Sequence, residues 1–97
     1  MAIDKVMSEH QRLSILLALG AMNGYQTNDS MLQSACAAYG HTMSNDRVLS
    51  HLAWLKEQGL VSLETNGIYT MATLSGRGQD VAEGVATCPG VKKPRAK

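Results

Sequence analysis

The sequence predicts a mainly α-helical domain with one small β-hairpin, in the order helix, helix, helix, hairpin, helix. Apolar residues recur at helical spacing in three segments of the first half, and each segment begins near a cap-forming residue and ends near a glycine. Further along, polar and apolar residues alternate with period two around Asn66-Gly67, a dipeptide that favours a tight hairpin turn. The 97 residues suffice for one such domain and leave no room for a second.

The first helix is expected over residues 9–22. Ser8 and Gln11 have the spacing of a capping box, in which a serine caps the helix and a glutamine three residues later bonds back to it. A wide apolar face of leucines follows. Asn23-Gly24 is expected to end the helix, because glycine tolerates the left-handed conformation found there. Residues 1–7 show no clear period and are interpreted as a lead-in.

The second helix is expected to begin at one of three cap formers, Thr27, Asn28 or Asp29. Apolar residues then recur at helical spacing, and Gly40 closes the helix after about ten residues.

The third helix is expected over residues 45–58, after a connection of three residues, 41–43. Ser44 is its cap, and Gly59 is its natural stop. Its buried face consists of Val48, Leu52 and Leu55.

A hairpin is expected over about residues 61–72, with its turn at Asn66-Gly67. A last helix around residues 76–86 follows, with an apolar seam of Val81 and Val85. Glycines within this helix weaken it, by roughly 1 kcal/mol each relative to alanine.

Two helices joined by a short turn are typical of a helix-turn-helix, and a tight hairpin directly after the second helix is the wing of a winged helix-turn-helix. We therefore predict a winged helix-turn-helix domain over residues 1–86. Residues 87–97 contain two prolines and four cations, and are expected to form a basic, disordered tail.

The net charge of +1 conceals a division along the chain. Residues 1–91 carry five basic side chains and all eight acids, whereas the last six residues carry four cations and no acid. The folded body is thus acidic, so a polyanionic partner would have to be bound by a local patch or by the tail. The four tail cations are Lys92, Lys93, Arg95 and Lys97. Each can neutralise one phosphate without reading sequence, or the tail can simply favour solubility.

The third helix is the candidate recognition helix, because the second helix of such a motif enters the major groove. On helical geometry its residues Arg47, Ser50 and Trp54 lie opposite the buried face, together with the acids Asp46 and Glu57. The candidate DNA contacts near its start are Ser44, Asn45, Arg47, Ser50 and His51. Arginine can bind guanine and asparagine can bind adenine in a bidentate way. The two acids favour the alternative of an ordinary solvated face.

Three further residues have more than one interpretation. Trp54 is either packed against the core, or part of a protein interface, or a nucleic-acid contact. Asn66 at the uncharged wing tip is either a DNA contact or a plain turn residue. His51 is alternatively a packed, hydrogen-bonded side chain. The three histidines lie on separate elements, so we expect no metal site.

Other classes of protein are disfavoured. No apolar run approaches the length of a membrane span or a signal-peptide core. Cys36 and Cys88 match no metal spacing and are expected to be thiols in a reducing cytoplasm. Phosphate-loop, paired-histidine and nucleophile-elbow motifs are absent, so we expect neither an enzyme nor a cofactor.

A resemblance to a known family lies in the stretch from Gly40 to Ala82. Leu55-x-x-x-Gly59-Leu60-Val61 is similar to the end of the recognition helix in winged-helix regulators, and Leu74-Ser75-x-x-Gly78 is similar to their return from the wing. The chain thus resembles small ArsR-like or MarR-like winged-helix proteins of Mu-like bacteriophages and prophages. The resemblance implies cytoplasmic binding of double-stranded DNA in the bacterial host, as a homodimer. Metal sensing is not implied, because it requires a pair of cysteines and only Cys36 lies near the motif.

The sequence therefore predicts a DNA-binding transcriptional regulator of phage origin. The alternative is a winged-helix module that binds a protein partner through Trp54 and its acidic neighbours, without direct DNA contact.

Overall fold

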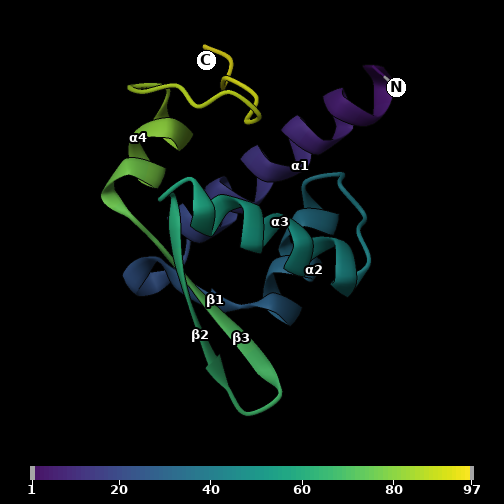
Figure 1. Ribbon diagram of the computed structural model, residues 1–97, viewed down its shortest axis with the longest axis vertical. Helices are drawn as coiled ribbons and strands as arrows, with labels where there is room; N and C mark the ends of the chain where they lie inside the picture. The colour runs from purple at the N-terminus through teal and green to yellow at the C-terminus, as the bar shows by residue number, and fades with distance from the viewer. Residues whose placement is uncertain (1, 97) are drawn as a thin grey trace.

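The computed structural model describes residues 2–96 and has four α-helices and a three-stranded antiparallel sheet. It is mainly helical, as expected. In Figure 1 the β2–β3 hairpin points away from the helices, while both ends of the chain lie at the opposite end of the molecule. No helix of the described residues has the length and apolar character needed to cross a bilayer.

Helix α1 (Ala2–Gly20) begins well before the predicted capping box. Ser8 and Gln11 therefore lie inside the helix and cap nothing, and residues 2–7 are its first turns rather than a lead-in. The capping-box prediction was wrong because serine and glutamine at this spacing can equally serve a tertiary contact. Both side chains bind a residue of α3, as described below.

Strand β1 (Gln26–Asn28) is an element that the sequence analysis missed. It follows a single 3₁₀ turn, Asn23–Tyr25, in which Gly24 has a φ of 70°. The strand pairs antiparallel with β3, with Thr27 opposite Ala72. Three residues are too few to reveal a period of two, so only the pairing partner identifies this segment as a strand.

Helices α2 (Asp29–Ala38) and α3 (Asn45–Glu57) confirm the predicted pair, but α2 ends before Gly40 and the connection, residues 39–44, is longer than the three residues predicted. Among the three possible caps of α2, Asn28 is the one used, because its Oδ1 accepts a hydrogen bond from the Met31 N–H at 2.7 Å. Ser44 caps α3, as predicted, by accepting from the Arg47 N–H at 3.1 Å.

The hairpin consists of β2 (Val61–Asn66) and β3 (Tyr69–Leu74), and β3 is the central strand of the sheet. Asn66 pairs with Tyr69, so the two turn residues are Gly67 and Ile68, one position later than predicted. Gly67 has a φ of 64° and Ile68 has no positive φ. A glycine at the first turn position is typical of a type II′ turn, which matches the twist of the strands.

Helix α4 (Gly76–Glu83) is shorter than predicted and ends at Gly84, which has a φ of 81°. Val81 is buried, but Val85 lies beyond the helix and is 74% exposed, so the predicted seam of Val81 and Val85 was wrong. Gly78 has a packing role, because a Cβ there would lie 2.1 Å from the Leu60 carbonyl oxygen.

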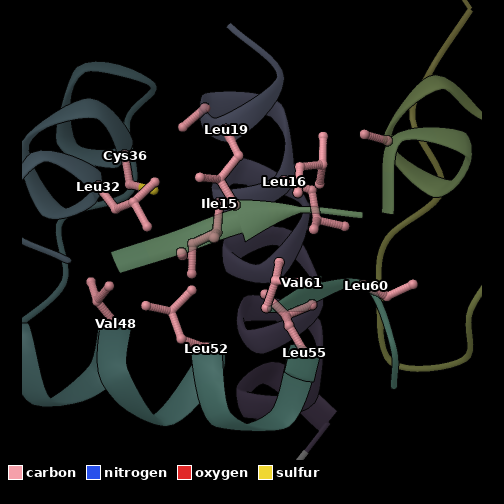
Figure 2. Close-up of a cluster of buried hydrophobic side chains, with 14 of the residues drawn as sticks. Ile15, Leu16, Leu19, Leu32, Cys36, Val48, Leu52, Leu55, Leu60 and Val61 are labelled. Atoms are coloured by element: carbon pink, nitrogen blue, oxygen red, sulfur yellow. The ribbon is translucent and has the colours of Figure 1, made fainter. Parts of the chain in front are cut away.

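The core lies between α1, α2, α3 and the sheet, and Figure 2 shows side chains of these elements pointing toward one another. Burying a large aliphatic side chain stabilises the fold by roughly 1.5–3 kcal/mol. The predicted buried face of α3 is confirmed in full. The residues labelled in Figure 2 are Ile15, Leu16, Leu19, Leu32, Cys36, Val48, Leu52, Leu55, Leu60 and Val61.

The C-terminal segment (residues 87–96) differs from the expected free tail. Cys88 is buried, and the Lys92 N–H donates to the Glu9 carbonyl oxygen of α1 at 3.2 Å. The side chain of Arg12 on α1 donates to the Gly90 carbonyl oxygen at 3.0 Å. The start of the segment is therefore held against α1 by hydrogen bonds that a count of prolines and charges does not reveal.

Candidate nucleic-acid interface

The outward face of α3 carries fewer candidate contacts than helical geometry indicated. Ser44 and Ser50 are exposed, in keeping with a surface role. Asp46 and Glu57 are exposed on the same helix. The exposed residues of α3 therefore include hydroxyl groups and two acids, and also the bases Arg47 and Lys56.

Asn45 was expected to face DNA, but it is turned toward α2. Its Nδ2 donates to Asp29 Oδ2 at 2.8 Å, while Asp29 Oδ1 accepts from the Thr70 N–H of β3 at 3.0 Å. Burial by itself would raise the pKa of the Asp29 carboxyl, but hydrogen bonds from Asn45, Thr70 and the start of α2 outweigh it and lower that pKa. Asn45 and Asp29 thus join α2, α3 and β3 at the start of α3.

His51 was also expected on the DNA side, and this was wrong: its side chain is only 4% exposed. Its Nε2 lies 2.8 Å from Gln11 Oε1, and its Nδ1 accepts from Arg12 Nε at 3.3 Å. Because an amide oxygen only accepts, the proton of the neutral ring is on Nε2. Burial, together with the neighbouring charges of Arg12 and Arg47, lowers the pKa of His51 to about 4. The alternative interpretation, a packed and hydrogen-bonded histidine, describes this residue.

Arg47 is exposed, but its guanidinium lies back against α1. Its Nε donates to Gln11 Oε1 at 3.0 Å, and its Nη2 donates to Ser8 Oγ at 2.9 Å. Arg47 was expected to reach into a groove as a free side chain. Here it is positioned on the flank of α3 that faces α1.

Trp54 lies on the same flank and is partly buried against the core. The guanidinium carbon of Arg12 is 4.0 Å from the centre of its ring. Gly90 covers another part of the ring, because a Cβ at Gly90 would lie 2.5 Å from Trp54 Cζ2. Of the three alternatives for Trp54, packing is the one the structure supports.

The tip of the β2–β3 hairpin is uncharged and carries one almost fully exposed apolar side chain. Asn66 is exposed at the last strand pair, and Ile68 beside it is 89% exposed. Asn66 is therefore available for a contact, although it lies at the end of a strand rather than in the turn.

The tail cations lie beside α1. Lys92 and Lys93 are adjacent, and Lys92 Nζ donates to the Lys93 carbonyl oxygen at 3.0 Å. Arg95 is exposed and lines a cavity with Leu13, Leu17 and Glu83. Lys97 lies outside the described residues.

The three histidines belong to separate elements, as expected, but two of them lie near each other in space. The rings of His10 and His41 have centroids 6.2 Å apart, whereas His51 binds Gln11 between α1 and α3. Within residues 2–96, no three side chains of histidine, cysteine, aspartate or glutamate gather as a metal site would need.

Comparison with known proteins places the chain in a phage family. It is 45% identical over 93 residues to "Uncharacterized protein gp26" of Escherichia phage Mu, and the match covers 96% of each chain. The chain belongs to the family of Mu gp26. An "Uncharacterized protein" of Haemophilus influenzae is 39% identical to it over 64 residues, which are 66% of this chain and 62% of that protein. No family model matches the chain.

The relation to Mu-like phages that the motifs indicated is therefore confirmed, and the similarity to Mu gp26 extends over nearly the whole chain. In this gp26-family chain, sequence reasoning missed Gln11 and Arg12 as partners of α3. The available signal was two polar residues just before the apolar run of α1. Gln11 was instead interpreted as part of a helix cap, and Arg12 was given no role.

Proposed function

We propose that this member of the Mu gp26 family is a winged helix-turn-helix protein that binds double-stranded DNA and regulates transcription in the cytoplasm of the bacterial host. The observation that carries the proposal is the arrangement of α2, a connection of residues 39–44, α3 and the β2–β3 hairpin directly after it. In proteins of this architecture the second helix enters the major groove and the wing contacts the flanking backbone.

In the proposed complex the first turn of α3 approaches the major groove. Ser44 and Ser50 are exposed there, and the first N–H groups of the helix favour a phosphate. Asn66 contacts the backbone from the wing. Asn45 and His51 hold α3 in place from inside the fold and do not touch DNA.

A binding assay with phage-genome fragments tests this proposal. Fluorescence anisotropy is measured over a range of salt concentrations, since the electrostatic part of the affinity is greatest at low salt. We expect binding at about 50 mM salt that weakens steeply as salt increases. Absence of binding at that salt would contradict the proposal.

A charge reversal on the helix face makes the test specific. Ser50→Glu adds a negative charge to the outward face of α3 and is expected to reduce DNA affinity at least tenfold. Gln79→Glu adds the same charge on α4 and serves as the matched control. Equal effects of the two substitutions would exclude α3 as the DNA-facing helix.

We further propose that the protein acts as a homodimer through the first turns of α1. The wide apolar face of α1 is largely buried in the core, but Ile3, Val6 and Met7 remain about half exposed at the start of the helix. Ile3→Glu is expected to convert a dimer into a monomer in light scattering, while Ile68→Glu at the wing tip leaves the dimer intact. A monomeric wild-type protein at high concentration contradicts this part of the proposal.

A second candidate function is that of a protein-interaction module. The specific observation that favours it is the pair of exposed acids on α3, Asp46 and Glu57, which repel phosphate. Asp46→Asn combined with Glu57→Gln distinguishes the two functions. The double substitution should strengthen DNA binding if α3 faces DNA, and should weaken capture of a basic protein partner if α3 binds one.

A further inference from the structure

Two arginines from different helices meet in the seam between α1 and α3, and each of them binds only neutral groups. Arg12 donates to His51 Nδ1 and to the Gly90 carbonyl oxygen. Arg47 donates to Gln11 Oε1 and Ser8 Oγ. Within residues 2–96, no carboxylate accepts a hydrogen bond from either guanidinium. The two positive charges are therefore not neutralised by a direct partner.

The two guanidinium groups are close neighbours in one hydrogen-bonded chain. Arg47 and His51 share the oxygen of Gln11, and the other ring nitrogen of His51 accepts from Arg12. Burial lowers the pKa of Arg12, and the nearby charge of Arg47 lowers it further, whereas Glu9 acts in the opposite direction. Like charges held together in this way repel one another, and an anion between them relieves the repulsion.

Both arginines are held in position while retaining free donors. A guanidinium has five N–H donors, and Arg12 uses only Nε and Nη1, while Arg47 uses only Nε and Nη2. Arg12 is also stacked on Trp54, at 4.0 Å from the ring centre. Nη2 of Arg12 and Nη1 of Arg47 therefore make no hydrogen bond within the described part of the chain and remain for a ligand. Because the side chains are already ordered, little conformational entropy is lost when a ligand binds.

We propose that Arg12 and Arg47 together form a phosphate-binding site in the α1–α3 seam, which holds a backbone phosphate of DNA on the flank of α3 that faces α1. This inference rests on the proposed DNA-binding function. It assigns Arg47 to phosphate binding rather than to base reading, and adds Arg12, a residue of α1, to the interface. Guanidinium groups match phosphate oxygens in geometry, and contacts of this kind position a protein without reading sequence.

The site can be tested without DNA, because Trp54 is the only tryptophan and lies under Arg12. Inorganic phosphate is titrated into the full-length protein at constant ionic strength, while Trp54 fluorescence and the Nε–H signals of the two arginines in NMR spectra are followed. We expect saturable changes with phosphate that chloride does not produce, and their loss in Arg47→Gln. Identical responses to phosphate and chloride would overturn the proposal.

The DNA assay gives a second, independent arm. Arg47→Gln should weaken binding to all sequences alike and lower the slope of log affinity against log salt by about one. Arg77→Gln removes the same charge from an exposed side chain of α4 and should leave phosphate binding at the seam and Trp54 fluorescence unchanged. If wild-type protein binds DNA and Arg47→Gln alters base preference with an unchanged salt slope, Arg47 reads bases and the inference fails. If wild-type protein binds no DNA, the proposed function fails, and the phosphate titration still decides whether the site binds anions.

Discussion

At the residue scale, the direction of a few polar side chains determines which part of α3 is available to a partner. Gln11 is the central case, because its single side-chain oxygen accepts from both Arg47 and His51. Removing such an acceptor leaves two buried or partly buried donors unpaired, which costs roughly 1–3 kcal/mol per group. The contacts that hold α3 against α1 are thus polar as well as apolar.

The buried neutral His51 makes stability depend on pH. Its pKa is about 4 in the folded protein, below its ordinary value of 6.5. Between these values the unfolded chain takes up a proton that the folded chain excludes, so the free energy of unfolding falls as pH decreases through this window. Since one pKa unit corresponds to about 1.4 kcal/mol, protonation of His51 alone should lower the free energy of unfolding by roughly 3 kcal/mol across this window. Urea denaturation at a series of pH values measures this dependence of the unfolding free energy on pH.

His51→Gln provides the control, because glutamine does not titrate. The variant should show a flatter dependence of unfolding free energy on pH between 6.5 and 4, whatever its absolute stability. An equal slope in wild type and His51→Gln would contradict the assignment.

At the element scale, the local sequence determines helices and hairpin well, because their signals are contained within them. Ser44 caps α3, and the alternating pattern produces β2 and β3, as expected. The predictions were wrong where a contact with another element determines the local structure. Strand β1 exists because β3 pairs with it, and the turn lies at Gly67-Ile68 because the register of the two strands places it there.

Helix α4 offers a matched pair of glycines. A Cβ at Gly78 would lie 2.1 Å from the Leu60 carbonyl oxygen, whereas a Cβ at Gly76 meets nothing within 4 Å. We expect Gly78→Ala to destabilise the protein by about 1–3 kcal/mol through overpacking against backbone. Gly76→Ala should be neutral or stabilising by up to about 1 kcal/mol, because alanine favours a helix. Thermal or urea unfolding measures both, and equal effects would contradict the packing shown for Gly78.

At the scale of the whole molecule, the position of the C-terminal segment follows only from the tertiary structure. Its start packs on Trp54 and Arg12, and its cations follow beside α1. Acidic body and basic tail are thus joined at a defined place on the α1–α3 seam. Lys92 and Lys93 follow shortly after Gly90, close to Arg12, whereas Arg95 lies further away, between α1 and α4.

Two truncations separate the packing of this segment from its charge. A chain ending at Ala86 loses Cys88 and Gly90, and should be less stable by about 1–3 kcal/mol, with the fluorescence of Trp54 shifted to the red. A chain ending at Val91 keeps both residues but loses the hydrogen bond from Lys92 to Glu9, so it should be only slightly less stable than the wild type, with unchanged Trp54 fluorescence. It should bind DNA with a lower salt dependence, because four cations are gone. If it binds DNA with unchanged affinity and salt dependence, the tail cations do not contact DNA.

The sequence by itself determined the number and order of the main helices, the hairpin, and the Ser44 cap and buried face of α3. These features depend on residues close together in the chain, whose spacing sets which side of a helix or strand is apolar. The tertiary structure alone decided that Asn45 and His51 turn inward, that Arg47 meets Arg12, and that the C-terminal segment covers Trp54. Polar side chains at the edge of a buried face can point either way, and their direction is chosen by partners that lie far away in the sequence.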